Sequence, residues 1–168
     1  TMELFPNTHA DEKCQQNSLL NLKECQKQVV QCESYPRRIV LELTNACNMN
    51  CIMCGRNDVK FTPTFFDVSW IDKLSEVLPK VEEVTLMGWG EPTLHPQFVE
   101  ILEKLSAYPN LRKYFCTNGM KLAELMPAIF ANKVDIIAIS LDGAHAAMND
   151  RIRRGSDFSF ICDTLRKI

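Results

Sequence analysis

The chain has 168 residues, 46% of them hydrophobic, and a formal net charge of −2. This length supports one domain with a hydrophobic core, and the near-neutral charge argues against nucleic acid or an anionic membrane as a partner. No apolar run approaches the roughly 20 residues of a membrane span, and residues 1–10 lack the pattern of a signal peptide, so we expect a cytoplasmic protein whose cysteines are thiols or metal ligands.

The predicted elements alternate between helices and strands. Residues 1–36 are expected to form a leader with one helix at 15–32, where the apolar stripe includes Leu19, Leu22 and Val29. Residues 37–168 are expected to form the main domain. Its strands are predicted at 38–43, 82–88, 112–117 and 134–141, and its helices at 69–78, 96–107, 121–132 and 157–168. This order predicts an α/β fold with a parallel sheet and right-handed crossovers.

Each predicted strand runs into a polar or glycine-rich turn. The first leads into a cysteine-rich loop, and the others lead into GWGEP (88–92), TNG (117–119) and SLDG (140–143). Because the carboxyl ends of parallel strands share one rim of a βα array, these four turns are expected to build a single site.

The loop after the first strand carries Cys47, Cys51 and Cys54 in the spacing C-x3-C-x2-C. A closed zinc site needs four ligands, and the next cysteine downstream, Cys116, is far along the chain. A four-iron cluster held by three thiolates has one iron free to bind a substrate or cofactor. A zinc module, a non-catalytic iron–sulfur electron carrier and a loop without metal are the alternatives, and a carrier needs neither the open iron nor the special turns.

The cysteine motif, followed by G-x-GEP, TNG and S-x-D, resembles the radical S-adenosylmethionine (radical SAM) superfamily. It is most similar to the branch of peptide-modifying and cofactor-maturing enzymes with C-terminal auxiliary-cluster (SPASM-type) domains. The resemblance implies that the three cysteines hold a [4Fe–4S] cluster that chelates S-adenosylmethionine (SAM). Reductive cleavage of SAM would then give a 5′-deoxyadenosyl radical that abstracts hydrogen from a peptide or small-metabolite substrate.

The resemblance also implies which residues bind SAM. They are Met53, Gly88, Trp89, Gly90, Glu91, Asn118, Ser140, Asp142, Arg153 and Arg154. The GWGEP backbone would meet the SAM amino group, with Glu91 adding charge. Asn118 and Ser140 would contact the ribose or the methionyl part.

Three further positions complete this set of SAM contacts. Asp142 is a ribose or amino partner, and Arg153 or Arg154 would pair with the carboxylate, since a guanidinium suits bidentate recognition. Two positions depart from the usual family pattern. Met53 replaces the aromatic residue often found before the third cysteine, and Trp89, between the glycines, either covers the cofactor or fills the core.

The other cysteines are interpreted mainly as ordinary thiols. Cys14, Cys25 and Cys32 are alternatively ligands of an auxiliary cluster, with the last two on one helical face. Cys116 and Cys162 are expected in the core. Outside the cysteines, His95 is interpreted as a turn residue, while Glu42 and Thr44, which flank the loop, are either substrate-facing or structural.

The predicted fold is a partial (β/α) barrel. It has about four βα units, whereas the resemblance implies six. The fourth strand would then be an unprotected edge. We therefore expect either a missing C-terminal domain or self-association through residues 135–141. The implied reaction also requires an electron donor such as flavodoxin or ferredoxin.

Overall fold

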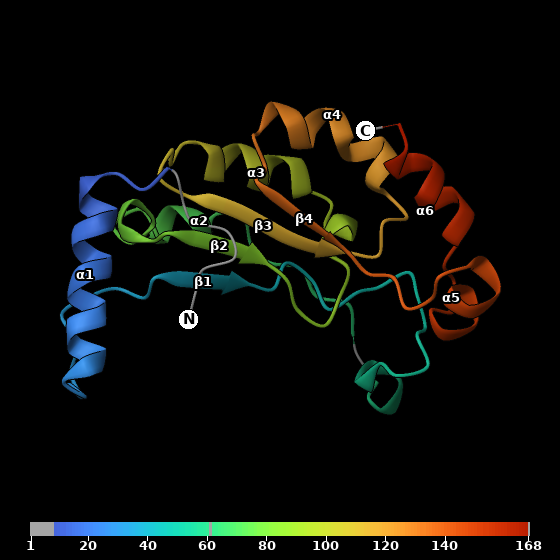
Figure 1. The fold of residues 1–168 in the computed structure, drawn as a ribbon, viewed down its shortest axis with the longest axis horizontal. Coiled ribbons are helices and arrows are strands. Elements are labelled where there is room, and N and C mark those ends of the chain that lie inside the picture. Colours follow the sequence, from blue (N-terminus) through green and yellow to red (C-terminus); the bar gives the residue numbers. More distant parts are fainter. Residues whose placement is uncertain (1–8, 61, 168) are drawn as a thin grey trace.

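The computed structural model describes residues 9–60 and 62–167 and has one parallel sheet with the strand order β1-β2-β3-β4 (Figure 1). The strands are β1 (Arg38–Leu41), β2 (Glu83–Leu86), β3 (Arg112–Thr117) and β4 (Ile136–Ile139). The predicted partial (β/α) barrel is confirmed. β3 has its predicted limits, while the other strands are shorter because their ends already belong to the turns.

Six α-helices accompany the strands in the described part of the chain. They are α1 (Glu12–Gln26), α2 (Trp70–Lys73), α3 (Phe98–Ser106), α4 (Leu122–Ala131), α5 (Ala146–Ile152) and α6 (Phe158–Leu165). Figure 1 shows α3 and α4 along one face of the sheet and α1 at the end where the strands begin. None of the described helices is long and apolar enough to cross a membrane.

The core lies between the sheet and α3. Alternate strand residues face this helix layer, so Leu86 and Phe115, which are paired in register, are both buried. Phe98 of α3 packs edge-on against Phe115, with 5.4 Å between ring centroids. On the other face of the sheet, Val40 of β1 is 54% exposed, whereas Thr85 of β2 is buried.

The leader helix differs from its prediction. Residues 1–8 lie outside the described residues, and α1 begins after Asp11, whose side chain accepts a hydrogen bond from Cys14 N. The helix ends at Gln26 because the backbone reverses at Gln28, which has a φ of 53°. The predicted stripe does not face the protein, since Leu19 is 58% exposed.

Polar contacts, rather than the apolar stripe, hold α1 in place. Asn17 donates to Tyr35 O and Lys80 O at 3.1 and 3.0 Å, and Glu24 accepts a hydrogen bond from Glu33 N at 2.8 Å. Hydrophobic periodicity does not reveal such polar contacts, and the predicted packing face of α1 was therefore wrong.

The predicted helix at 69–78 is reduced to the single turn of α2. Ser69 makes no capping bond through its side chain, and its backbone N–H is instead bound by Asp67. The α5 helix was not predicted. Its N-cap is His145, whose ring accepts a hydrogen bond from Met148 N, and this residue is an uncommon cap.

Ion pairs close the amino-terminal end of the sheet. Glu83 of β2 lies between Arg38 of β1 and Arg112 of β3, at 2.6 Å from a guanidinium nitrogen of each. Its side chain is 3% exposed. The opposite, carboxyl-terminal end carries the cysteine loop.

Candidate functional site

The cysteine loop is fixed on both sides by backbone hydrogen bonds. On one side, Ala46 O accepts from Glu91 N at 2.8 Å, which ties the loop to the GWGEP turn. On the other, Asn50 N donates to Arg154 O at 2.8 Å. The loop is therefore held between two of the segments that the sequence assigned to the same site.

A hollow of about 150 Å³ lies between this loop and the strand ends. It is lined by Cys47, Met49, Cys51, Cys54, Met87, Gly88, Trp89, Gly90, Glu91, Cys116, Thr117, Asn118, Ser140 and Arg153. The structure therefore brings the three thiols together with the turns after β2, β3 and β4. Of the sequence-assigned residues, Met53, Asp142 and Arg154 do not line it.

The three thiols of the loop are half-buried and free of disulfides. Burial raises the pKa of Cys51, while the positive charge of Arg153 acts in the opposite direction. Within residues 9–60 and 62–167, no group of three or more His, Cys, Asp or Glu residues could hold a single metal ion. A cluster differs because its thiolates bind separate irons, so three soft donors around one hollow fit a [4Fe–4S] group.

Glu91 joins two of the turns. Its side chain is buried and accepts hydrogen bonds from Thr93 Oγ1 at 2.6 Å, Thr117 Oγ1 at 2.7 Å and Asn118 N at 2.7 Å. Thr93 N adds a fourth at 3.2 Å. The implied contact with a SAM amino group therefore competes with four existing bonds, and this geometry makes Glu91 a positioning residue.

The glycines of GWGEP permit close packing within the protein. A side chain at Gly90 would meet the backbone carbonyl oxygens of Thr44 and Ala46, in the cysteine loop itself. A side chain at Gly88 would meet Glu42, whose Oε1 accepts a hydrogen bond from Trp89 N at 2.5 Å. Glu42 thus supports the turn, one of the two roles that the sequence left open.

The two candidate arginines differ in placement. Arg153 lines the hollow and lies 2.6 Å from Asp142 through its Nε atom. Arg154 is exposed and contributes its backbone oxygen to Asn50. Arg153 is therefore the arginine available to an anionic group in the hollow, and Asp142 acts on it from outside.

The turns after β3 and β4 meet the loop through side chains. Asn118 donates to Asn48 Oδ1 at 2.7 Å and lies 4.0 Å from Cys47 Sγ. Ser140 Oγ is 3.4 Å from Cys116 Sγ. Cys116 is half-buried and lines the hollow, so its assignment to the core was wrong.

Trp89 and Met53 are both largely exposed, at 54% and 56%. A Cβ atom built on Gly55 would lie 3.0 Å from the Trp89 ring, so this ring covers the loop just after Cys54. Trp89 therefore does not fill the core. Met53 is on the same loop but does not line the hollow.

The remaining candidates lie away from the thiols or have structural contacts. Cys14 belongs to α1 and is buried, whereas Cys25 and Cys32 are exposed. Cys32 lies beyond the helix, so the shared helical face was wrong. Cys162 is half-buried beside the fully buried Ile161, which faces the core in its place.

His95 is buried with both ring nitrogens engaged, by Phe66 O at 2.9 Å and Gln97 N at 3.1 Å. This confirms it as a turn residue. Sequence reasoning missed Asn48, Met49, Met87 and Thr117. Asn48 and Met49 carried a signal, because they lie between the first two cysteines.

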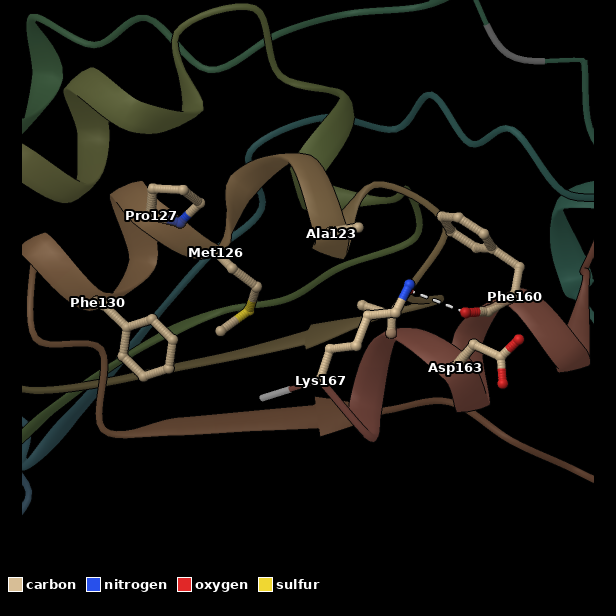
Figure 2. A pocket seen from close by; sticks show the side chains of 8 residues that line it. Ala123, Met126, Pro127, Phe130, Phe160, Asp163 and Lys167 are labelled. Atoms are coloured by element: carbon tan, nitrogen blue, oxygen red, sulfur yellow. Dashed lines mark hydrogen bonds between the residues drawn. The ribbon is translucent and has the colours of Figure 1, made fainter.

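A second, larger hollow of about 500 Å³ lies between α4 and α6 (Figure 2). Met126 and Phe130 of α4 and Phe160 of α6 line it, with Asp163 and Lys167 at its border. It shares no lining residue with the thiol hollow.

Comparison with known proteins identifies the family. The profile of the Radical SAM superfamily matches residues 41–168. The mycofactocin maturase MftC of Mycobacterium ulcerans (strain Agy99) is 29% identical over 135 residues, 79% of this chain and 36% of the maturase. The GTP 3′,8-cyclase of Lactiplantibacillus plantarum is 29% identical over 143 residues, 78% of this chain and 42% of the cyclase. Streptococcus suis SuiB, solved with the precursor peptide SuiA, has a TM-score of 0.60 at 19% identity, over 82% of this chain and 31% of SuiB.

The chain belongs to the radical SAM superfamily, a family of enzymes that use a [4Fe–4S] cluster and SAM. The resemblance drawn from the cysteine motif is thereby confirmed. The chain spans 36% and 42% of the two curated relatives' lengths.

Proposed function

We propose that this chain is the catalytic part of a radical SAM enzyme in which Cys47, Cys51 and Cys54 bind a [4Fe–4S] cluster. The observation that carries the proposal is that these thiols and the ends of β2, β3 and β4 line one hollow. When bound and reduced, the cluster supplies the electron that cleaves SAM to methionine and a 5′-deoxyadenosyl radical, which takes a hydrogen atom from the substrate.

The chain's own residues bind and orient SAM. Arg153 holds its carboxylate, and the ion pair with Asp142 at 2.6 Å fixes the guanidinium for that contact. The Gly88 and Gly90 backbone would bind the amino group. Asn118, through its bond to Asn48, keeps the TNG turn against the cysteine loop.

Further SAM contacts are proposed at the edge of the hollow. Ser140 contacts the ribose or methionyl part, and Trp89 covers the hollow and excludes water. Met53, which is exposed on the cysteine loop, would pack against the cofactor through its thioether.

We propose a peptide or small metabolite as the substrate, and an electron donor such as flavodoxin or ferredoxin. The peptide is favoured by SuiB, which was solved with a precursor peptide, and by the maturase relative. The cyclase relative is named for GTP, which keeps the small metabolite as the second candidate. We propose that either substrate approaches the hollow past β1, where Val40 is half-exposed.

Anaerobic reconstitution with iron and sulfide tests the proposal. The wild-type protein should bind about four irons per chain and, with a chemical reductant, convert SAM to 5′-deoxyadenosine. Replacing any one of the three cysteines by Ala should abolish both, while Cys25→Ala, at an exposed thiol outside the site, should change neither. A triple variant that still assembles the cluster, or bound zinc in place of iron, would reject the proposal.

A further inference from the structure

A third hollow lies at the opposite end of the sheet from the thiols. It has a volume of about 380 Å³ and is formed where α3 and α4 end and β3 and β4 begin. Its lining residues are His9, Ser106, Pro109, Leu111, Lys113, Ala131, Asn132, Lys133 and Asp135. None of these residues lines the cysteine hollow.

Lys113 is the unusual residue of this hollow. It is the second residue of β3, points toward the helix layer and is only 6% exposed. Within the described part of the chain, its ammonium group makes no hydrogen bond or ion pair. The charge of this mostly buried side chain has no acceptor among the described residues, and burial lowers the pKa of Lys113.

The neighbouring carboxylate does not satisfy this lysine. Asp135 attracts Lys113 electrostatically, but its Oδ1 is 2.9 Å from His9 Nε2 and its Oδ2 accepts from the backbone N–H of Lys113 at 2.7 Å. Each oxygen therefore already has a partner. Lys133 brings a second positive charge, which also lowers the pKa of Lys113.

We infer that this hollow binds a phosphate group, either as the free ion or as part of a small phosphomonoester. Two ammonium groups from different segments can surround a tetrahedral dianion, and lysine binds phosphate as a point charge without the planar geometry that carboxylate favours. The apolar walls of Pro109, Leu111 and Ala131 leave room for an organic part. The site lies outside the cysteine chemistry and does not depend on it.

The test measures phosphate binding to the purified chain by calorimetry, with acetate at the same ionic strength as the reference salt. Lys113→Met, which keeps the length of the side chain, should weaken binding by about tenfold or more. Lys133→Met should also weaken phosphate binding. Because Lys133 is exposed, this variant tests the site even if Lys113→Met fails to fold. Lys121→Met removes the same charge from an exposed site outside the hollow and should leave affinity unchanged.

Phenyl phosphate separates the two sources of the group. Tighter binding than inorganic phosphate assigns the hollow to a phosphomonoester, and weaker or equal binding assigns it to the free ion. Absence of binding for both, or equal affinities in the Lys113→Met and Lys121→Met variants, would overturn the inference. These measurements need neither iron nor SAM, so their failure leaves the proposed function unaffected.

Discussion

Glu83 and Glu91 are both buried glutamates, at opposite ends of the same sheet, and their partners differ. Glu83 lies between two guanidinium groups, from Arg38 and Arg112, at 2.6 Å each. Glu91 accepts four hydrogen bonds, all from neutral hydroxyl or backbone donors. The Glu83 carboxylate is neutralised by arginines of the two neighbouring strands. The Glu91 carboxylate instead joins two turns through hydrogen bonds, without a cation.

This difference indicates that one end of the sheet stabilises the fold and the other end forms the candidate site. At the amino-terminal end, the guanidinium groups of Arg38 and Arg112 form structural ion pairs with Glu83. At the carboxyl-terminal end, Glu91 is satisfied without Arg153, so the guanidinium of Arg153 faces the hollow beside Cys51. Variants at one end should therefore change unfolding, and variants at the other should change cofactor binding.

The largest expected effect on stability comes from Glu83→Ala. It removes the ion-paired carboxylate of Arg112, whose side chain is 12% exposed, which should lower the free energy of unfolding by about 3–5 kcal/mol. Arg38→Ala removes the more exposed partner and should cost at most about 1 kcal/mol. Urea unfolding measures both, and iron per folded chain should remain unchanged. Equal losses for the two variants would contradict this account.

Gly90→Ala should affect both the stability of the fold and the binding of iron. The added Cβ meets backbone carbonyl oxygens of the cysteine loop, so the loop must move, at a cost of about 1–3 kcal/mol and with loss of iron binding. In the control Gly55→Ala, the new Cβ meets only the Trp89 ring, which can shift. Reconstituted iron should fall in the first variant and persist in the second, and the reverse order would refute the packing argument.

Glu91→Gln tests the positioning role. An amide places an NH2 group against hydroxyl and backbone donors, so about 1–2 kcal/mol of stability should be lost and exchange of the Asn118 amide hydrogen should accelerate. Glu42→Gln, which can still accept the single bond from Trp89 N, is the control. Measured on protein without SAM, unchanged exchange in Glu91→Gln would show that the carboxylate does not hold the turn.

The sequence predicted those elements whose packing is apolar and periodic. In α3, Phe98, Ile101, Leu102 and Leu105 follow the helical period and are all buried. In β3, buried and half-buried residues alternate from end to end. The leader helix was predicted, but its packed face was assigned wrongly, because Asn17 and Glu24 hold it through hydrogen bonds that leave no apolar pattern.

The sequence was sufficient to predict which segments form the site, but not which contacts each of their residues makes. Four turns at the strand ends were enough to place the thiols and the glycines at one rim. The role of Glu91 depends on Thr117, 26 positions later in the chain, and no local pattern indicates that bond. The choice between Arg153 and Arg154 depends on which way the chain turns after α5.

A smaller effect, which depends on protein concentration, is self-association through the edge strand β4. In the described residues β4 pairs only with β3, so its outer edge offers free backbone groups. We expect the isolated chain to self-associate through residues 135–141, measured by size exclusion with light scattering. Ile136→Lys should shift it toward the monomer, while Val30→Lys, at a fully exposed position in the leader, should not. A monomeric wild-type chain at high concentration would disprove the expectation.

The smallest effect concerns the pH dependence of the amino-terminal end. Burial alone would raise the pKa of Glu82, but hydrogen bonds from Arg37, at 2.9 Å to each carboxylate oxygen, outweigh it and hold the pKa below 4.5. A carboxylate with a lowered pKa in the folded state contributes stability that is fully present above its unfolded pKa. That stability is lost as the pH falls through the folded value.

Glu82→Gln should therefore be less stable than the wild type at pH 7, and this difference should shrink as the pH falls below about 4.5. Urea unfolding of both proteins across this range, with the thiols kept reduced, measures the difference. Asp163→Gln, at an exposed ion pair with Arg166, is the control and should show almost no difference at any pH. A Glu82→Gln difference that stays constant from pH 7 into the acid range would show that the Arg37 pair does not act through the carboxylate charge.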